Sequence, residues 1–297
     1  MVLPSCSVAA GAFTSSTVYL NGEFIPAAEA RVSVFDRGFL FGDAVYEVIR
    51  YFSGVPFAMD LHLQRLERTL REVRFAHFKA REIVRLGEQL LDRNDLHDAC
   101  VYWQITRGCG AGRSHLPPAE MRATVFGCVD RTPPLSECVE PAEVSAALHE
   151  DWRWGRCDIK STNLLPNVLG KIAVADRGAG EVIFHRGGFV SEAGSTTVLI
   201  VRGGRLITPP IDDPDLSILH GVTRRVVARL PGVDLIEQPV TVEELRSADE
   251  IVLAGTRTLL AAVTRLDGEP VGGGQVGPVV RSVLARFVDA IAESVEV

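Results

Sequence analysis

The stretch "RWGRCDIKSTNLL", residues 153–165, places Lys160 on a short segment of mixed polarity. Lysine is scarce in this chain: only residues 79, 160 and 171 among the 31 basic side chains are lysines. An amine withdrawn from water holds its proton less tightly and can attack a carbonyl at neutral pH. We predict that "CDIKS" is a strand. A lysine at a strand edge can equally keep its amine in solvent, so the residue alone leaves both interpretations open.

The other two lysines are weaker candidates for a precisely aimed amine. Lys171 lies in "NVLGKIAVAD", which has the pattern of a helix, and Lys79 precedes another predicted helix. A lysine on the exposed side of a helix usually points its amine into water. Chemistry that needs an amine nucleophile therefore points first to Lys160.

Composition excludes several classes of function. The 297 residues carry a net charge of −7, which argues against nucleic acid binding. Six scattered cysteines form no C-x-x-C pair and no zinc-type spacing, so we predict no metal and a reduced, cytoplasmic protein. No stretch is long and apolar enough to predict a membrane span. Residues 1–16 have no charged start and no apolar core, and we predict a disordered or loosely attached lead-in rather than a signal peptide.

The first half of the chain predicts a small domain over residues 17–131. A hairpin is expected at Asn21-Gly22 and a second strand pair around Gly54. Leucines at helical spacing predict a helix from about residue 60, with Asp60 as its N-cap, and another over 80–93. Two strands, "ACVYWQITRG" and "ATVFGCV", should flank the Gly-rich loop "GCGAGRSHLPP".

A Pro-rich segment at 132–141 predicts an interdomain linker, followed by a larger domain over 142–297 that carries Lys160. This domain should hold a helix near 163–177, strands over 181–208 with turns at Gly187-Gly188 and Gly203-Gly204, and a closing helix from about Pro278. Helices and strands do not alternate regularly, so we predict an α+β fold rather than a doubly wound sheet.

Several polar residues could serve either structure or chemistry. Glu192 in "FVSEAGSTTV" could end a turn or face a ring nitrogen. Val222 and Thr223 begin a helix whose free N–H groups could bind a phosphate, with help from the Thr256 hydroxyl and the Arg65 guanidinium. Each of these features has an ordinary structural explanation when taken alone.

A further group surrounds the Gly-rich loop. Arg113 and His115 in this loop could bind an anion, and Tyr46 in "FGDAVYEVIR" could lie in the core or in a site. An Arg-x-His pair in a loop is a weak signal in isolation.

Taken together and in this order, five stretches resemble the fold-type IV, or class IV, pyridoxal-phosphate aminotransferases. They are "RGFLFGDAVYEVIR", "HLQRL", "RCDIKSTNLLPNVLGK", "VSEAGSTTV" and "LHGVTRRVV". The resemblance runs from about residue 17 to the end. It implies a smaller N-terminal α/β domain and a larger C-terminal domain with a β-rich core.

The resemblance also implies roles for individual residues. Lys160 looks like the Schiff-base lysine that also carries the proton, and Glu192 like the acid facing the pyridine nitrogen. Arg65, Val222, Thr223 and Thr256 look like the phosphate site. Arg153 and Glu181 look like supporting positions near the phenolic oxygen of the cofactor, pyridoxal 5'-phosphate, and the lysine.

Within the family, the chain is most similar to D-amino acid aminotransferases. In those enzymes the positions of Tyr46, Arg113 and His115 bind the α-carboxylate, and the loop comes from the partner subunit, which implies a homodimer. The chain departs from the pattern at Ala44, at Gly180, after Glu192, at Arg257 and in a longer loop before Arg113. These changes bear on the choice of substrate.

The resemblance therefore predicts a ping-pong transaminase that moves an amino group between a D-amino acid and a 2-oxo acid. The alternatives are a branched-chain L-amino acid aminotransferase, an (R)-amine transaminase and, in another reaction class, an aminodeoxychorismate lyase. A chain that keeps the fold but binds no cofactor is the non-enzymatic alternative.

Overall fold

The computed structural model describes residues 15–75, 78–110, 112–213 and 215–295. Contacts group them into two compact units. The N-terminal unit contains the described residues up to Pro134 together with Ile159–Asn163, and the C-terminal unit contains Leu135–Asp158 and the described residues from Leu164 onward. The predicted lead-in lies almost wholly outside the described residues. The predicted domain limits at 17–131 and 142–297 stay a prediction.

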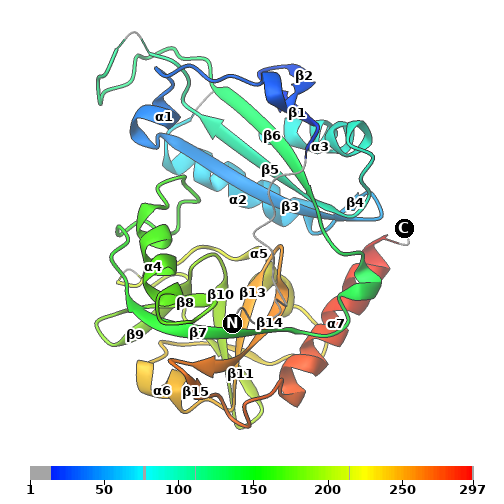
Figure 1. Ribbon diagram of the computed structural model, residues 1–297, viewed down its shortest axis with the longest axis vertical. Helices are drawn as coiled ribbons and strands as arrows, with labels where there is room; N and C mark the ends of the chain where they lie inside the picture. Colours follow the sequence, from blue (N-terminus) through cyan, green and yellow to red (C-terminus); the bar gives the residue numbers. More distant parts are fainter. Residues whose placement is uncertain (1–14, 76–77, 111, 214, 296–297) are drawn as a thin grey trace. The chain divides into compact units, whose positions relative to one another are not determined.

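The N-terminal unit is built on a six-stranded antiparallel sheet with the order β2-β1-β6-β5-β3-β4 (Figure 1). The predicted hairpin is confirmed, because Asn21 (φ 53°) and Gly22 (φ 110°) join the first two strands in a turn that needs positive φ. The strands are β1 (Thr17–Leu20), β2 (Glu23–Pro26), β3 (Ala44–Phe52), β4 (Val55–Pro56), β5 (Ala99–Thr106) and β6 (Thr124–Arg131).

Two amphipathic helices, α2 (Met59–Glu72) and α3 (Glu82–Arg93), pack on this sheet and enclose a core around Trp103. The predicted N-cap of α2 is wrong: Ala58 caps the helix in a left-handed conformation (φ 53°), and Asp60 lies in the first turn. The unit also holds a 3₁₀ helix (Ala27–Glu29) and the short helix α1 (Arg37–Phe41).

The C-terminal unit contains a mixed nine-stranded sheet with the order β12-β11-β10-β13-β14-β7-β8-β9, and β15 pairs with β14. The pairs β11–β12, β14–β7 and β7–β8 are parallel, and the others are antiparallel. The strands are β7 (Ala142–Glu150), β8 (Glu181–Arg186), β9 (Phe189–Ala193), β10 (Thr197–Arg202), β11 (Arg205–Thr208), β12 (Leu235–Glu237), β13 (Glu250–Gly255), β14 (Leu259–Leu266) and β15 (Glu269–Pro270).

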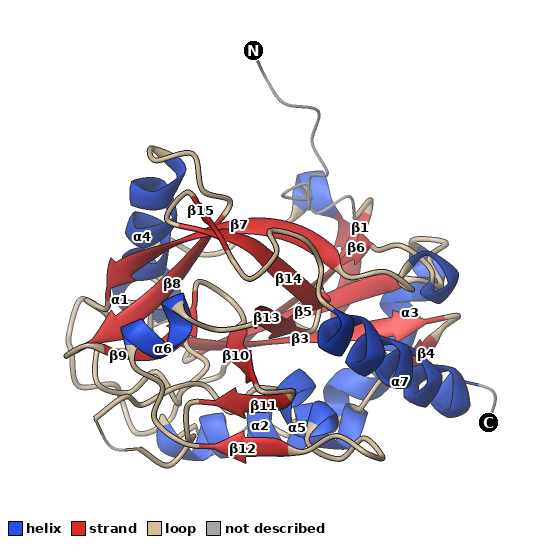
Figure 2. Ribbon diagram, turned by 90° about the horizontal axis from the view of Figure 1, so that it is seen from below, coloured by secondary structure: helices blue, strands red, loops and turns tan. Residues whose placement is uncertain are grey.

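Helices of this unit pack on different parts of its sheet (Figure 2). The predicted glycine turns are confirmed, since all four glycines at 187–188 and 203–204 have positive φ. The helices are α4 (Leu165–Ala175), α5 (Val222–Val227), α6 (Val242–Arg246) and α7 (Pro278–Val295), with a 3₁₀ helix at Leu135–Glu137.

The segment "CDIKS" is not a strand, which corrects the prediction. It forms turns and a single bridge, Ser161 to Val45. The amide of Tyr46 donates to the Lys160 carbonyl (3.0 Å), and the Thr162 amide donates to the Ala44 carbonyl (3.1 Å). The lysine segment is therefore tied to β3 in the N-terminal unit.

The predicted α+β class is confirmed, because an antiparallel sheet with helices on it and a mixed sheet with peripheral helices make up the two units. Among the described residues, no helix combines the length and apolarity that crossing a bilayer requires.

Candidate active site

The predicted site residues fall into two groups, one in each unit. Lys160, Tyr46, Arg65, Arg113 and His115 belong to the N-terminal unit. The C-terminal unit holds Arg153, Glu181, Glu192, Val222, Thr223 and Thr256.

Lys160 is half-buried, and its amine lies over an aromatic ring. Its Nζ is 4.1 Å from the centroid of the Tyr46 ring, which in turn stacks on Tyr102 at 5.6 Å. A cation over a ring face is attracted by the ring's negative face, so Tyr46 gives the amine a defined position. By contrast, Lys79 is exposed before α3, and Lys171 Nζ is 2.9 Å from a Glu181 oxygen.

Arg65 lies on α2 in a buried charge cluster with Glu47 and His62. Its Nε donates to Glu47 Oε2 at 3.0 Å, and His62 Nδ1 is 3.0 Å from Glu47 Oε1. Helical spacing puts His62 and Arg65 on one face of α2, which covers Glu47 on β3. The carboxylate is fully buried, and it also accepts from the Val48 amide.

The charges of this cluster depend on one another. Burial raises the pKa of Glu47, but the Arg65 charge and the His62 contacts outweigh it, and the pKa falls well below its ordinary value. Burial lowers the pKa of His62 more than the Glu47 carboxylate raises it. The cluster therefore rests as a carboxylate and a guanidinium beside a neutral imidazole at neutral pH. The sequence prediction included Arg65 and missed Glu47.

Arg113 and His115 come together on one aromatic ring. The Arg113 Cζ lies 5.2 Å from the Phe41 centroid, and the His115 ring meets the same ring edge-on at 5.4 Å. Both polar side chains are exposed. A guanidinium beside an imidazole can bind a carboxylate through several donors, which is the chemistry predicted for the pair.

Glu192 is a buried residue of β9 and not part of a turn. Arg153 Nη1 donates a short hydrogen bond to its Oε1, and the Leu219 amide donates to Oε2 at 3.2 Å. Asp151 holds the other side of Arg153 with contacts of 2.9 and 2.8 Å. The guanidinium is thus fixed between two carboxylates.

The pKa of Arg153 follows from this arrangement. Burial lowers it, but the Glu192 and Asp151 carboxylates outweigh the burial and raise the pKa above the ordinary value. Burial raises the pKa of Asp151, and the hydrogen bonds from Arg153 bring it below the usual range. Burial also raises the pKa of the neighbouring Cys157 thiol to about 12, so this cysteine is not a nucleophile at neutral pH. The sequence prediction missed Asp151, whose only signal is its place two residues before Arg153.

Val222 and Thr223 are the first two residues of α5, and both are buried. The approach to this helix start is narrow, because a Cβ on Gly221 would lie 2.5 Å from Thr197 Oγ1. Thr256 directly follows β13, and a Cβ on the preceding Gly255 would lie 2.7 Å from Thr196 Cγ2. Two predicted positions thus lie next to glycines that approach neighbouring threonines closely.

Glu181 begins β8 as a half-buried residue, and Lys171 is its ion-pair partner. Its predicted place beside the cofactor stays a prediction.

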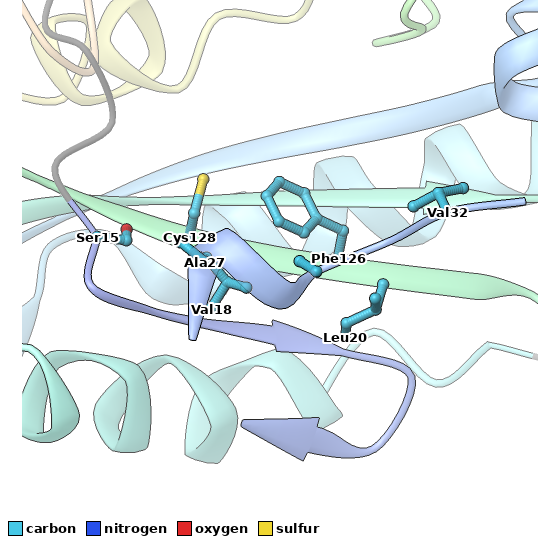
Figure 3. A pocket seen from close by; sticks show the side chains of 8 residues that line it. Ser15, Val18, Leu20, Ala27, Val32, Phe126 and Cys128 are labelled. Atoms are coloured by element: carbon cyan, nitrogen blue, oxygen red, sulfur yellow. The ribbon is translucent and has the colours of Figure 1, made fainter. Parts of the chain in front are cut away.

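A separate apolar pocket of about 350 Å³ lies against β1 and β6 (Figure 3). Burial raises the pKa of the Cys128 thiol to about 12. The lining consists of small and apolar side chains and includes no predicted site residue: Ser15, Val18, Leu20, Ala27, Ala30, Val32, Phe126 and Cys128. This pocket is therefore not the candidate active site.

The sequence matches the family Amino-transferase class IV over residues 44–266. The chain belongs to this family. This chain is 36% identical over 274 residues to the D-alanine aminotransferase of Staphylococcus haemolyticus. The alignment covers 91% of this chain and 96% of that protein.

Solved structures agree with this assignment. The branched-chain amino acid aminotransferase of Escherichia coli superposes with a TM-score of 0.83 at 25% identity, covering 93% of this chain and 94% of that one. A hypothetical aminotransferase of Mycobacterium tuberculosis in its PLP-bound form has a TM-score of 0.77 at 25% identity, over 92% and 98% of the two chains. The class IV aminotransferase is a pyridoxal-phosphate-dependent transaminase with the predicted fold-type IV architecture.

The residues present in the class IV aminotransferase fit this cofactor. The C-terminal unit offers a buried carboxylate at Glu192 for a protonated ring nitrogen, and a helix start without side chain at Gly221. Thr196 Oγ1 is buried and has no hydrogen-bond partner among the described residues, although buried hydroxyls normally have one. The Thr196 hydroxyl, next to Gly255, and the N–H groups at the start of α5 are donors of the kind that a phosphate accepts from.

Proposed function

We propose that this class IV aminotransferase transfers an amino group from a D-amino acid to a 2-oxo acid in two half-reactions. The observation that carries the proposal is the placement of Arg113 and His115 against the one ring of Phe41. This pair supplies a charge and several donors for an α-carboxylate. The similarity to the D-alanine aminotransferase of Staphylococcus haemolyticus supports the same substrate class.

When bound, pyridoxal phosphate supplies an aldehyde that condenses with amines and a ring that accepts the electron pair left when a substrate Cα loses its proton. Lys160 would hold the cofactor through Nζ and, when displaced by the substrate amine, would move the proton of the substrate Cα. Its contact with the Tyr46 ring keeps the amine in a defined position. These roles make Lys160 the general acid and base of both half-reactions.

Glu192 would keep the ring nitrogen protonated, which is what makes the ring a good electron acceptor. The Arg153 guanidinium donates to one oxygen of this carboxylate and the Leu219 amide to the other, so that both oxygens are held in place. Val222, Thr223, Thr256 and Arg65 would bind the phosphate group. Arg65 brings a positive charge whose orientation Glu47 fixes.

We also propose that the protein is a cytoplasmic homodimer. On α4 the side chains of Leu165, Val168, Leu169 and Ile172 follow helical spacing on one face and are 45–68% exposed. An apolar face of this kind marks an interaction surface in a water-soluble chain. The cysteines of the described part form no disulfide with one another, in keeping with a reducing compartment.

The substrate class is tested by a half-reaction titration. Protein loaded with cofactor is mixed with D-alanine, L-leucine or (R)-phenylethylamine, and the visible absorbance of the bound cofactor is followed. Bleaching by D-alanine at the lowest concentration, restored by 2-oxoglutarate, is the expected result. Bleaching by L-leucine alone would contradict D-specificity.

A branched-chain L-amino acid aminotransferase is the second candidate, supported by the TM-score of 0.83 to the Escherichia coli enzyme. Preference for (R)-phenylethylamine would favour an (R)-amine transaminase. Pyruvate release from aminodeoxychorismate without an oxo acid would indicate a lyase. A protein that stays colourless with added cofactor would have kept only the fold.

A further inference from the structure

Arg37, the first residue of α1, is a buried cation with three fixed partners. Only 4% of its surface is exposed. Its Nε donates to Asp43 Oδ2 at 2.8 Å, its Nη1 to the Ser114 carbonyl at 2.6 Å, and its Nη2 to the His115 carbonyl at 2.9 Å. The planar guanidinium thus joins a residue of α1 to a loop 77 residues further along the chain.

Asp43 supplies the counter-charge for this guanidinium. Burial raises the pKa of its carboxyl, but hydrogen bonds from Arg107 and Arg37 outweigh the burial and hold the pKa below the usual range. Arg107 Nε donates to the same oxygen at 2.8 Å, but its Nη2 donates to the Val73 carbonyl. The two arginines therefore share one carboxylate and hold different parts of the backbone.

The loop that Arg37 holds carries Arg113 and His115. Two glycines, Gly110 and Gly112, precede these residues, and glycines leave a backbone with many accessible conformations. Arg37 restricts this freedom at Ser114 and His115, because its planar guanidinium donates to both backbone carbonyls. The Phe41 ring, one turn along α1, contacts the side chains of Arg113 and His115 and lies 4.8 Å from the Arg37 guanidinium.

We propose that Arg37 is a positioning residue for substrate recognition: it fixes the loop backbone so that Arg113 and His115 present their donors to a carboxylate in one orientation. The inference rests on the proposed function, in which these two side chains bind the substrate carboxylate. Arg37 itself uses its three nitrogens on protein oxygens and does not contact substrate. Its effect belongs to binding of the carboxylate group and not to the proton transfer at Cα.

The test compares Arg37→Gln and Arg37→Lys with Arg107→Gln, a matched control that disturbs the same Asp43 carboxylate but not the loop. Two constants are measured on cofactor-loaded protein. The first is the KM for D-alanine, determined separately from kcat. The second is the Kd of propionate, measured from the change in cofactor absorbance; propionate is alanine without its amino group.

For Arg37→Gln we expect both constants to rise about tenfold or more, because a small displacement of a binding group is enough for such a loss. The kcat of Arg37→Gln should stay within about threefold of the wild type. Arg37→Lys should recover part of the loss, because its amine can donate to one of the two carbonyls. Arg107→Gln should keep both constants within about twofold of the wild type. Unchanged constants in folded, loaded Arg37→Gln would overturn the inference.

Arg113→Gln separates this inference from the proposed function. If Arg113→Gln leaves the Kd of propionate unchanged, the carboxylate role of the loop is wrong. If Arg113→Gln weakens propionate and Arg37→Gln does not, only the positioning role is wrong. Should the Arg37 variants fail to fold, Asp43→Asn carries the test, since it removes the counter-charge that holds the Arg37 guanidinium, and Arg107→Gln again serves as the control. An unchanged Kd of propionate in Asp43→Asn would overturn the inference too.

Discussion

Arg153 donates a short hydrogen bond to Glu192 while two contacts from Asp151 hold its other edge, and all three side chains are buried. The fixed guanidinium therefore holds the Glu192 carboxylate in one direction. One substitution of nearly equal shape, Glu192→Gln, tests the role proposed for this carboxylate.

Glu192→Gln should reduce the limiting rate of the half-reaction with D-alanine by roughly 100-fold or more, the effect of removing one preorganised charge. The amide cannot hold a proton on the cofactor's ring nitrogen as a carboxylate does. Single-turnover absorbance measurements give this rate separately from substrate binding. Glu150→Gln, at an exposed position in the same unit, is the control; equal rates in the two variants would contradict the role of Glu192.

Lys160 should be the lysine that carries the cofactor. Reduction of the loaded protein with borohydride, followed by peptide mapping, should place the label on the peptide that contains Lys160. Lys160→Ala should lose the label, and Lys79→Ala should retain it, because Lys79 is exposed before α3. A label on Lys79 or Lys171, or on no peptide, would refute the assignment.

The stability of the fold should depend on pH through His62. Burial holds the pKa of His62 below the ordinary 6.5, so the unfolded chain binds a proton that the folded chain does not. Stability from this group is therefore complete above about pH 6.5 and falls as the pH drops through the lower folded pKa. Urea midpoints between pH 8 and about pH 5 should fall less steeply for His62→Gln than for the wild type.

His97→Gln is the control for the loss of any one histidine from the same unit. If His62→Gln keeps the full slope of the wild type, the loss of stability has another origin. Glu47 adds to the same trend at lower pH, since its pKa is also depressed and its contribution is lost as pH falls below about 4.5.

Gly221→Ala should weaken cofactor binding without breaking the fold. The added Cβ would lie 2.5 Å from Thr197 Oγ1 at the start of α5, while the φ of −61° suits alanine. The dissociation constant of pyridoxal phosphate, from the titration of its absorbance, should rise about tenfold. Gly273→Ala, where a Cβ meets nothing within 4 Å, is the matched control, and equal constants would exclude a phosphate site here.

The local signals in the sequence predicted much of the fold. Asn21-Gly22 and the glycine pairs at 187–188 and 203–204 adopt positive φ. Few other residue types adopt this conformation easily, so these residues indicate turns in the sequence itself. The helix after residue 58 followed from its leucine spacing. These features depend on neighbours within a few residues, so sequence alone was enough.

Features that depend on distant parts of the chain were missed. "CDIKS" has strand-like composition, but the one bridge that it forms with a described residue is to Val45, more than 100 residues earlier, and one bridge does not make a strand. In the sequence, Glu47 has the pattern of a polar position on an alternating strand. Its contacts with His62 and Arg65 of α2 form only in the folded unit. The same holds for Arg37, whose loop partners are 77 residues away. The family resemblance gave the cofactor, whereas spacing alone left each residue with an ordinary structural explanation.

Residues 159–163 are hydrogen-bonded to β3 and belong to the first unit, although they follow part of the second unit in the chain. The first unit is therefore not complete when its first continuous segment has been synthesised. A ribosome that has released residues up to Pro134 has not yet delivered the last backbone segment of the first unit. The first unit therefore receives Lys160 only after residues 135–158 of the second unit have been made. Splitting the gene at residues 132–141 would therefore place Lys160 and Tyr46 on different chains.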